Sequence, residues 1–339
     1  MKNQVTRRPI NKARYGSADL AADRLLTNVS VAHFQDNMAT FAHSAFATVP
    51  VNEPQGRYKV FNQADLTRPE AQVRKPNALF AEKTFGVAEQ TFLCEEYAVE
   101  TPLADEDRQT ADSVLDDQAM ARVLSQDLLL EREQRWTAAY LTPTSGVWSS
   151  HLTGGAEFTQ WNDTSPDILG DIDEWKDTIK LTCGMDPNVA VITRDVWRVI
   201  KNDAGVIARI AGAAGPTPGN AALVTVANFA ALIEMEEVII QGAVFNSASE
   251  GAAYSGSFFQ TERFGLFYKT PNPSILEPSA GYDFSWSPFD EVSSSGGLGA
   301  GIMKYRNELR AQDRFRGMTF NTFEVVTPGA GLVADDILV

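Results

Sequence analysis

The stretch ADSVLDDQAMARVLSQDLLLEREQRWTAAYL, residues 111–141, contains neither glycine nor proline. Its apolar residues mostly recur three to five positions apart, from Ala111 through to Tyr140. This spacing is typical of an amphipathic helix, and Pro143 follows where the pattern stops. At ~1.5 Å per residue the helix would be about 45 Å long, several times the ordinary length. The stretch therefore predicts a structural spine.

The residues that lead into this helix are strongly acidic. Between Glu100 and Asp117 the sequence has seven carboxylates and a single cation, Arg108. Acidic side chains at the start of a helix suit the positive end of its dipole, which supports the predicted helix. The seven are Glu100, Asp105, Glu106, Asp107, Asp112, Asp116 and Asp117.

The region before the acidic stretch has the opposite local charge. Residues 57–83 contain six basic and three acidic residues, in a chain whose formal net charge is −15. Extended runs at 57–61 and 91–94 flank a polar middle, 62–77, that has almost no apolar residue to bury. This composition predicts a long polar hairpin that stands away from its own core, and loops of this length often bind something.

Beyond the long helix, helical and extended patterns follow one another irregularly. We expect helices at 167–181, 195–202 and 226–234, and strands at 188–192, 238–244, 264–268, 282–286, 302–309 and 315–326. Because there is no regular alternation of strand and helix, the fold class is α+β. Residues 211–220 and 293–301 are typical of exposed loop tips.

Composition narrows the function classes. The chain has 339 residues, of which 44% are hydrophobic and 22% charged, so it can bury a sizeable core and is not disordered as a whole. Its 44 acidic against 29 basic residues repel polyanions, which argues against sequence-reading nucleic-acid binding. No apolar run approaches the ~20 residues of a membrane helix, and two cysteines, Cys94 and Cys183, are too few for a disulfide framework. We expect a soluble protein of a reducing compartment, without a membrane partner.

Motifs for catalysis are scarce. The sequence has no nucleophile elbow, no Walker phosphate loop and no His-Glu-x-x-His zinc motif, and its three histidines are scattered. The carboxylates Asp105, Glu106 and Asp107 could imitate an acid/base pair or a calcium site. Adjacent carboxylates in a charged run are more often a solvated face. We therefore expect no enzyme activity, no cofactor and no metal, and keep a cytosolic hydrolase using these carboxylates as a remote alternative.

The order of segments along the chain resembles the major capsid protein family of tailed bacteriophages, which has the Hong Kong 97-type capsid fold. The matching stretches cover most of the chain from residue 50 onward. They are ETPLADED (100–107), LERE (130–133), DPNVAVI (186–192), DVW (195–197), VIIQGAVFN (238–246), FGLFY (264–268), GYDFSW (281–286), the stretch 315–326 and GLVADDI (331–337).

This resemblance implies an arrangement in four parts. Residues 1–48 would be an N-terminal arm, basic over residues 1–14, and residues 49–98 an extended loop that lies across a neighbouring subunit. Residues 99–184 and 312–339 would form the peripheral domain around the spine helix, about 111–141. Residues 185–311 would form the axial domain, with a loop tip at the centre of a capsomer.

The resemblance also implies a function. The chain would be the major capsid protein of a bacteriophage head, a viral structural protein that self-assembles through hexamers and pentamers into an icosahedral shell around double-stranded DNA. It would be located in the virion after assembly in the host cytoplasm, with a portal protein and a decoration protein as partners. Some family members begin with a long, cleaved scaffolding segment; this chain starts with a short arm, so a separate scaffolding protein is expected. The alternative is an encapsulin-like compartment that encloses protein cargo.

The opposite local charges predict a contact between subunits. The hairpin of one subunit would dock on the acidic stretch of its neighbour, and because exposed ion pairs contribute little each, the contact would set register more than strength. The residues expected to take part are Arg57, Arg68, Arg74 and Lys75 on the hairpin and Glu100, Asp105, Glu106, Asp107, Asp116 and Asp117 on the stretch. Alternatively, these charges only keep the loop soluble.

Overall fold

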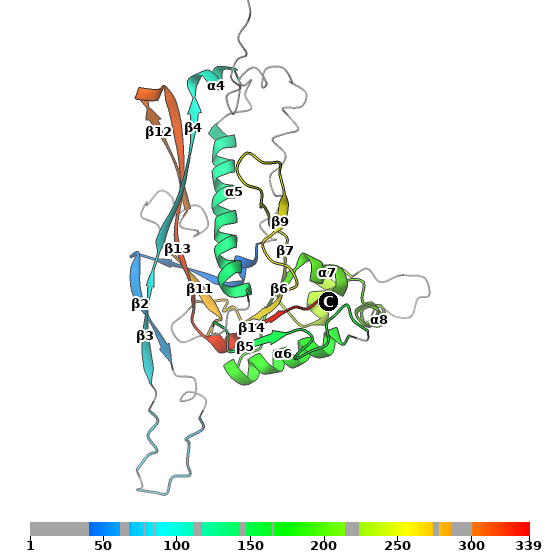
Figure 1. Ribbon diagram of the computed structural model, residues 1–339. Helices are drawn as coiled ribbons and strands as arrows, with labels where there is room; N and C mark the ends of the chain where they lie inside the picture. The colour runs from blue at the N-terminus through cyan, green and yellow to red at the C-terminus, as the bar shows by residue number, and fades with distance from the viewer. Residues whose placement is uncertain are drawn as a thin grey trace, which may run out of the picture. The chain divides into compact units, whose positions relative to one another are not determined.

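The computed structural model describes residues 41–61, 68–77, 79–84, 86–110, 117–142, 147–164, 166–213, 224–273, 278–286 and 300–339 (Figure 1). They fall into two compact units. Unit 1 comprises residues 97–128 and 301–318, and unit 2 comprises the other described residues. The predicted arm up to residue 40, Asp112, Asp116 and most of the two predicted loop tips lie outside the described residues.

Unit 1 combines strands β4, β12 and part of β13 with the first part of the long helix. Its elements are β4 (Glu95–Ala104), α4 (Asp105–Thr110), β12 (Ala300–Asn307), η5 (Glu308–Arg310) and the first parts of α5 (Asp117–Trp136) and β13 (Gln312–Val325). Both β4 and β12 pair with β13. A small core of Leu103, Leu124 and Phe315 lies between strands and helix. The helix approaches closely at Gly317, where a Cβ would lie 3.1 Å from the Cδ1 of Leu128.

The predicted spine helix is confirmed over the residues that are described. After α5 the chain continues into a π-helical turn, η3 (Thr137–Leu141), in which the Thr137 hydroxyl donates to the Glu133 carbonyl oxygen at 2.8 Å. Thr142 precedes Pro143, and a residue before a proline disfavours the helical backbone conformation. Thr142 is therefore extended, and the helix ends here. Residues 111–116 of the prediction lie outside the described residues.

The larger sheet of unit 2 has the strand order β5-β14-β10-β6-β7. Its strands are β5 (Ser150–Thr153), β14 (Gly331–Asp335), β10 (Phe264–Phe267), β6 (Val189–Thr193) and β7 (Glu237–Gln241). Every residue of β6, β10 and β14 is buried, as expected for strands covered on both faces. Strand β10 runs antiparallel to both of its neighbours, while the outer pairs are parallel.

Along the chain, helix α6 (Ile168–Cys183) lies between β5 and β6. Helices α7 (Arg194–Ile200), α8 (Ala204–Ala213) and α9 (Val226–Leu232) lie between β6 and β7. Helix α6 buries Ile168, Ile172, Trp175, Ile179 and Cys183, which recur at helical spacing. The Asp167 carboxylate caps its first turn by accepting from the Gly170 amide at 3.1 Å. Gly184, at a φ of +81°, ends it in the left-handed conformation that glycine adopts without strain.

A second group of strands in unit 2 joins distant parts of the chain. Strand β1 (Ala47–Val51) pairs in parallel with β11 (Gly281–Trp286), which pairs with the second part of β13. The antiparallel hairpin of β2 (Gln55–Phe61) and β3 (Val87–Leu93) leaves this group, and β8 (Val244–Asn246) pairs with β9 (Gly256–Phe258). Phe46, just before β1, contacts the rings of Trp136, Tyr140, Trp148, Phe267 and Phe323.

The α+β prediction is confirmed, with local differences. The predicted strand 238–244 is wrong in extent, because β7 ends at Gln241 and β8 begins at Val244 with a different partner. Helix α8 covers residues 211–213 of a predicted loop tip, and strands β5 and β14 were not predicted as separate elements. The two compact units have other bounds than the four implied parts, which stay a prediction.

Candidate subunit-contact surfaces

The predicted acidic stretch is paired with cations of its own chain. Glu100, on β4, accepts from the Tyr305 hydroxyl at 2.8 Å and forms ion pairs with Arg314 and, at 3.2 Å, with Arg316. The Tyr305 hydroxyl and the two guanidinium groups hold the pKa of Glu100 below its usual range. Since these partners come from β12 and β13, Glu100 serves to join strands within unit 1.

Asp105 and Asp117 are paired in the same way. Arg306 donates to both oxygens of Asp105, at 2.5 and 2.6 Å, and this bidentate pair lowers the pKa of Asp105. Asp117 lies 2.7 Å from both Arg108 and Lys304. These same cations also surround Asp313, where Lys304 and Arg306 hold the pKa of that carboxyl below its usual value.

We call this set the unit 1 charge cluster. It comprises the carboxylates Glu100, Asp105, Asp117 and Asp313 and the cations Arg108, Lys304, Arg306, Arg314 and Arg316. With four carboxylates against five cations, the cluster has no surplus of negative charge. The sequence prediction counted only the acids near the helix start and Arg108, and left out the cations of β12 and β13. Lys304 with Arg306, and Arg314 with Arg316, alternate at strand spacing, and this alternation could have revealed the missing partners.

The other three predicted residues of the acidic stretch are Glu106, Asp107 and Asp116. Glu106 is exposed, Asp107 is partly exposed, and Asp116 lies outside the described residues. The predicted docking of a neighbour's hairpin on this stretch stays a prediction. The cluster reduces the negative charge that the acidic stretch can offer to a neighbour's hairpin. Three of the acids expected to face a neighbour already face cations of unit 1.

The basic side of the predicted contact lies on the β2–β3 hairpin of unit 2. Arg57 on β2 pairs across the strands with Glu89 on β3 at 3.3 Å, and both side chains are largely exposed. Beyond the strand ends, Lys83 donates to the Arg68 carbonyl oxygen at 3.0 Å, joining the two limbs. The Arg74 guanidinium lies 4.1 Å from the centre of the Phe80 ring. Lys75 is exposed.

Apolar side chains are exposed on the same limbs. Val73 is fully exposed, Leu79 is 96% exposed and Phe80 75% exposed. Residues 68–77 are nearly all exposed, as expected of a hairpin that stands away from its core, but they form no strand, and the prediction did not single out Leu79 and Phe80 just beyond. Exposed aromatic and aliphatic groups next to cations are a typical composition of a contact surface.

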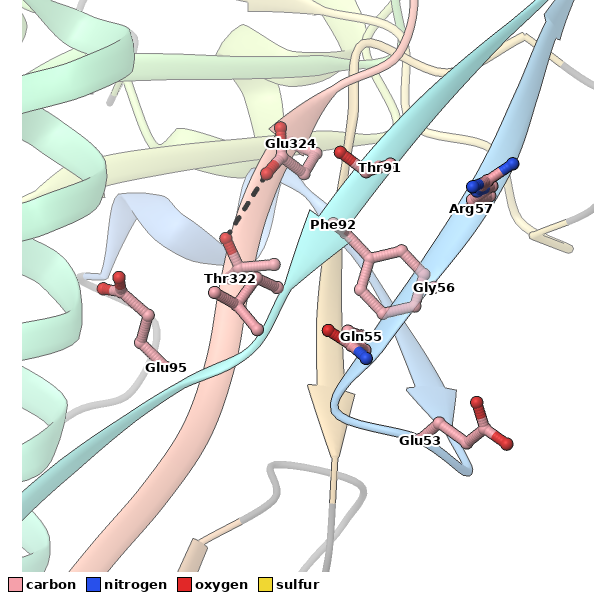
Figure 2. Close-up of a pocket in the computed structure, with 10 residues that line it drawn as sticks. Glu53, Gln55, Gly56, Arg57, Thr91, Phe92, Glu95, Thr322 and Glu324 are labelled. Carbon is pink, nitrogen blue, oxygen red and sulfur yellow. Dashed lines mark hydrogen bonds between the residues drawn. The ribbon is translucent and has the colours of Figure 1, made fainter.

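A groove of about 800 Å³ lies where the hairpin meets β13 (Figure 2). It is lined by Glu53, Gln55, Gly56, Arg57, Thr91, Phe92, Leu93, Glu95, Thr322 and Glu324. The Phe92 ring is buried, stacking on Phe284 at 4.3 Å between ring centres, whereas Leu93 is 56% exposed. The wall of this groove thus combines apolar surface with three carboxylates and one guanidinium.

Glu324 is the unusual member of the groove. Its carboxylate accepts from the Thr322 hydroxyl at 3.5 Å, a contact drawn in Figure 2, and no cation among the described residues pairs with it. Burial raises the pKa of Glu324 above its usual range. Burial also raises the pKa of Tyr58 to about 12, and the charge of Glu324 adds to that shift. The groove therefore holds a half-buried negative charge without a described cation opposite.

The carboxylate of Glu133, by contrast, has hydrogen-bond partners from its own chain. Glu133 of α5 is wholly buried and accepts from the amides of Ala42 and His43, at 2.9 and 3.1 Å, and faces His43 Nδ1 at 3.0 Å. Beside it Arg132 pairs with Asp283, which also accepts from the Asn321 amide at 3.0 Å. We call these residues the unit 2 polar network. It holds residues 41–46 inside the core.

The two cysteines behave as small buried side chains. Burial raises the pKa of Cys94 to about 11, and its thiol donates to the Phe284 carbonyl oxygen at 3.4 Å. Burial also raises the pKa of Cys183. Both effects disfavour the reactive thiolate. Within the described residues, no helix is long and apolar enough to cross a membrane.

We compared the sequence and the structure with known proteins. No protein-family model and no curated protein matches the sequence. Among solved structures, a phage-related protein from Bordetella bronchiseptica is similar with a TM-score of 0.64 at 20% identity, over 92% of this chain and 96% of that one. The capsid of cyanophage P-SCSP1u matches with a TM-score of 0.56 at 9% identity, over 89% of each chain. A virus-like particle from Pyrococcus furiosus matches with a TM-score of 0.52 at 8% identity, over 91% and 96%.

The fold is that of phage capsid proteins. The likeness extends over nearly the whole chain and is shared by the mature capsid of bacteriophage PhiM1, so it does not rest on one neighbour. The predicted resemblance to the major capsid proteins of tailed phages is thereby confirmed at the level of the fold.

Proposed function

We propose that the chain is the major capsid protein of a tailed bacteriophage and that many copies assemble into an icosahedral shell around double-stranded DNA. The observation that carries the proposal is the capsid fold over about nine-tenths of the chain. The exposed apolar and basic hairpin supports it, because surface of this kind favours contact with another molecule.

The proposed role is structural, without catalysis. A general acid or base needs a pKa near the working pH, whereas Arg306 lowers the pKa of Asp105. This disfavours the remote hydrolase alternative. The proposed partners are further copies of the chain in hexamers and pentamers, a scaffolding protein, a portal protein, a decoration protein and packaged DNA. The proposed location is the virion, after assembly in the host cytoplasm.

The second candidate is a compartment that encloses protein cargo. Similarity to the virus-like particle from Pyrococcus furiosus is the observation in its favour. The two candidates share the fold and differ in what the shell contains, so the contents decide between them.

The test is to express the chain alone and together with its neighbouring genes, and to examine the products by negative-stain electron microscopy. Closed particles support a shell, and their contents, nuclease-protected DNA or a co-purifying protein, separate the two candidates. A compact monomer or dimer under every condition contradicts both.

The predicted role of the hairpin cations has its own test. Reversing the charges of Arg68, Arg74 and Lys75 together is expected to impair assembly while leaving the subunit folded, because all three lie outside the strands of the hairpin. Normal shells from the triple variant would contradict the role.

A further inference from the structure

The apolar core of unit 1 is small for the number of elements that it joins. Leu103, Leu124 and Phe315 form it, with Val99 and Met120 packed beside them. The main core of unit 2 includes most of the buried apolar side chains of the described residues. A region with few buried apolar contacts opens at a lower free-energy cost than the rest of a protein. Unit 1 therefore depends more than unit 2 on its polar contacts.

Asp313 is the centre of these polar contacts. Its carboxylate lies 2.9 Å from Arg108, 3.1 Å from Lys304 and 3.2 Å from Arg306. The three cations come from α4 and β12, whereas Asp313 lies near the start of β13. Its side chain is 10% exposed, less than those of the other carboxylates of the unit 1 charge cluster. One shielded carboxylate thus joins a helix and two strands.

The other elements of unit 1 are tied to the same cluster. Asp117 brings in α5 through two cations, each at 2.7 Å, and Glu100 brings in β4 through its partners on β12 and β13. Glu308 on η5 lies 3.6 Å from Arg306. The charged and titratable groups that face one another are Glu100, Asp105, Arg108, Asp117, Lys304, Tyr305, Arg306, Glu308, Asp313, Arg314 and Arg316.

Acid changes the charge balance of this cluster. With its four carboxylates ionised and its five cations, the unit 1 charge cluster has a formal charge of +1, and with the carboxylates protonated it has +5. Each exposed pair contributes little by itself, but protonation removes the pairs over one range of pH while the cations stay charged. Repulsion among the cations then replaces the attraction that held the strands.

Strand β12 is the element that this change affects most. Hydrogen bonds from its consecutive residues 304–306 are the main reason that the pKa values of Glu100, Asp105 and Asp313 lie below their usual range. Successive side chains of a strand face opposite sides, so these acids hold β12 on both of its faces. Their stabilisation is complete above the unfolded-state pKa of about 4 and is lost as pH falls through the folded-state values.

The carboxylates of unit 2 with shifted pKa values respond to acid in the opposite direction. Burial raises the pKa of Asp171 and of Glu324, so the folded chain takes up their protons more readily than the unfolded chain. Through these two groups, acid favours the folded state of unit 2. His43 acts against this, but its effect begins already below pH 6.5, well before the unit 1 carboxylates lose their charge.

We propose that unit 1 is an acid-sensitive switch: when the carboxylates of the unit 1 charge cluster take up protons, β12 separates from β13 and from α4 while unit 2 stays folded. The five cations then repel one another, and the small core of Leu103, Leu124 and Phe315 is too little to hold the strands. The inference concerns the single subunit. It goes beyond the proposed function and holds whether a shell of this chain encloses DNA or protein.

Hydrogen exchange measured by mass spectrometry tests the switch on the full chain. Protection factors, which remove the intrinsic pH dependence of exchange, are compared for peptides of the two units between pH 6 and pH 2.5. We expect residues 302–307 and 312–318 to lose protection about tenfold or more below pH 4, in a step that β6, β10 and β14 do not share. All six tryptophans lie in unit 2, so their fluorescence checks independently that this unit stays folded.

Asp313→Asn tests the centre of the cluster at neutral pH. The amide keeps the size of the side chain but removes its charge, so Arg108, Lys304 and Arg306 lose the carboxylate that they share. We expect residues 302–307 to exchange about tenfold faster than in the unaltered chain at pH 7. The matched control is Asp127→Asn, which removes an exposed carboxylate of unit 1 outside the cluster and should leave exchange unchanged.

The outcomes decide the inference separately from the proposed function, because none of them requires particles to form. Loss of protection in unit 1 at a pH where unit 2 keeps its protection supports the switch. Loss in both units in one step, or a unit 1 that stays protected down to pH 2.5, overturns it. Exchange in Asp313→Asn no faster than in Asp127→Asn would overturn the central role of Asp313.

Discussion

The unit 1 charge cluster and the unit 2 polar network use the same side chains in opposite surroundings. In the cluster, arginines and carboxylates meet at the surface, where water and salt screen them and each pair contributes little. In the network, Arg132, Glu133 and Asp283 are almost wholly removed from water. There the loss of one partner leaves a buried charge with no compensation. The ion pairs of the two sets have similar geometry. Burial alone makes the loss of a partner much more costly to stability in the network than in the cluster.

The largest effect is expected at Glu133. Glu133→Ala leaves two buried amides and the His43 ring without their acceptor, and because each unsatisfied buried group costs about 1–3 kcal/mol, the total loss should be about 3 kcal/mol or more. Urea denaturation measures the loss, with Asp127→Asn on the exposed face of the same helix as the control. A loss no larger than that of the control would show that Glu133 does not hold residues 41–46.

A second large effect is expected at Arg132. Arg132→Met leaves the buried Asp283 with neutral donors alone among its described partners, the Asn321 amide at 3.0 Å and the Thr48 hydroxyl at 3.5 Å, at a cost of about 3 kcal/mol or more. The double variant Arg132→Met with Asp283→Leu should recover much of that stability, because it leaves no unpaired charge. A double-mutant cycle from urea denaturation measures the coupling, and strict additivity would contradict it.

A moderate effect of pH is expected from His43. Burial lowers the pKa of His43 below 6.5, so below pH 6.5 the unfolded chain takes up a proton that the folded chain does not. Stability should therefore fall as pH drops from 6.5 to the folded-state pKa, and this slope should disappear in His43→Gln. Denaturation midpoints between pH 7.5 and 5 measure it. Identical slopes in both proteins would assign the effect to other groups.

The smallest effect is expected in the unit 1 charge cluster. Glu100→Gln keeps the shape and part of the hydrogen bonding, so the melting temperature should change only slightly, and less still at high salt. Because the pKa of Glu100 is lowered, its contribution is present above about pH 4.3 and is lost as pH falls through the folded-state pKa. A large change in melting temperature that persists at high salt would show that Glu100 contributes as much to stability as the buried groups of the unit 2 polar network.

Local sequence patterns were enough to predict the elements whose apolar residues recur with a strong period. The spine helix, α6 and the hairpin strands could be predicted because apolar spacing and turn residues specify them within one segment. Strands β5 and β14 could not, because four-residue and five-residue strands gain their stability from partners far along the chain.

The candidate site was harder to predict for a related reason. The hairpin cations were found from local charge, which the sequence displays directly. The neutralisation of Glu100 and Asp105 depends on β12 and β13, about two hundred residues later, and the groove depends on β13 meeting β2 and β3. Charge counted along a segment does not reveal which charges remain available after folding.

The position of β14 bears on how the chain is synthesised. This strand lies between β5 and β10, yet residues 331–335 are translated after every other strand of the sheet. Until they leave the ribosome, β5 has no partner in the sheet and β10 keeps one edge bare, which is the kind of edge that aggregates. A chain cut before residue 331 is therefore expected to leave β5 unpaired and one edge of β10 open, however well the rest of the sheet has formed.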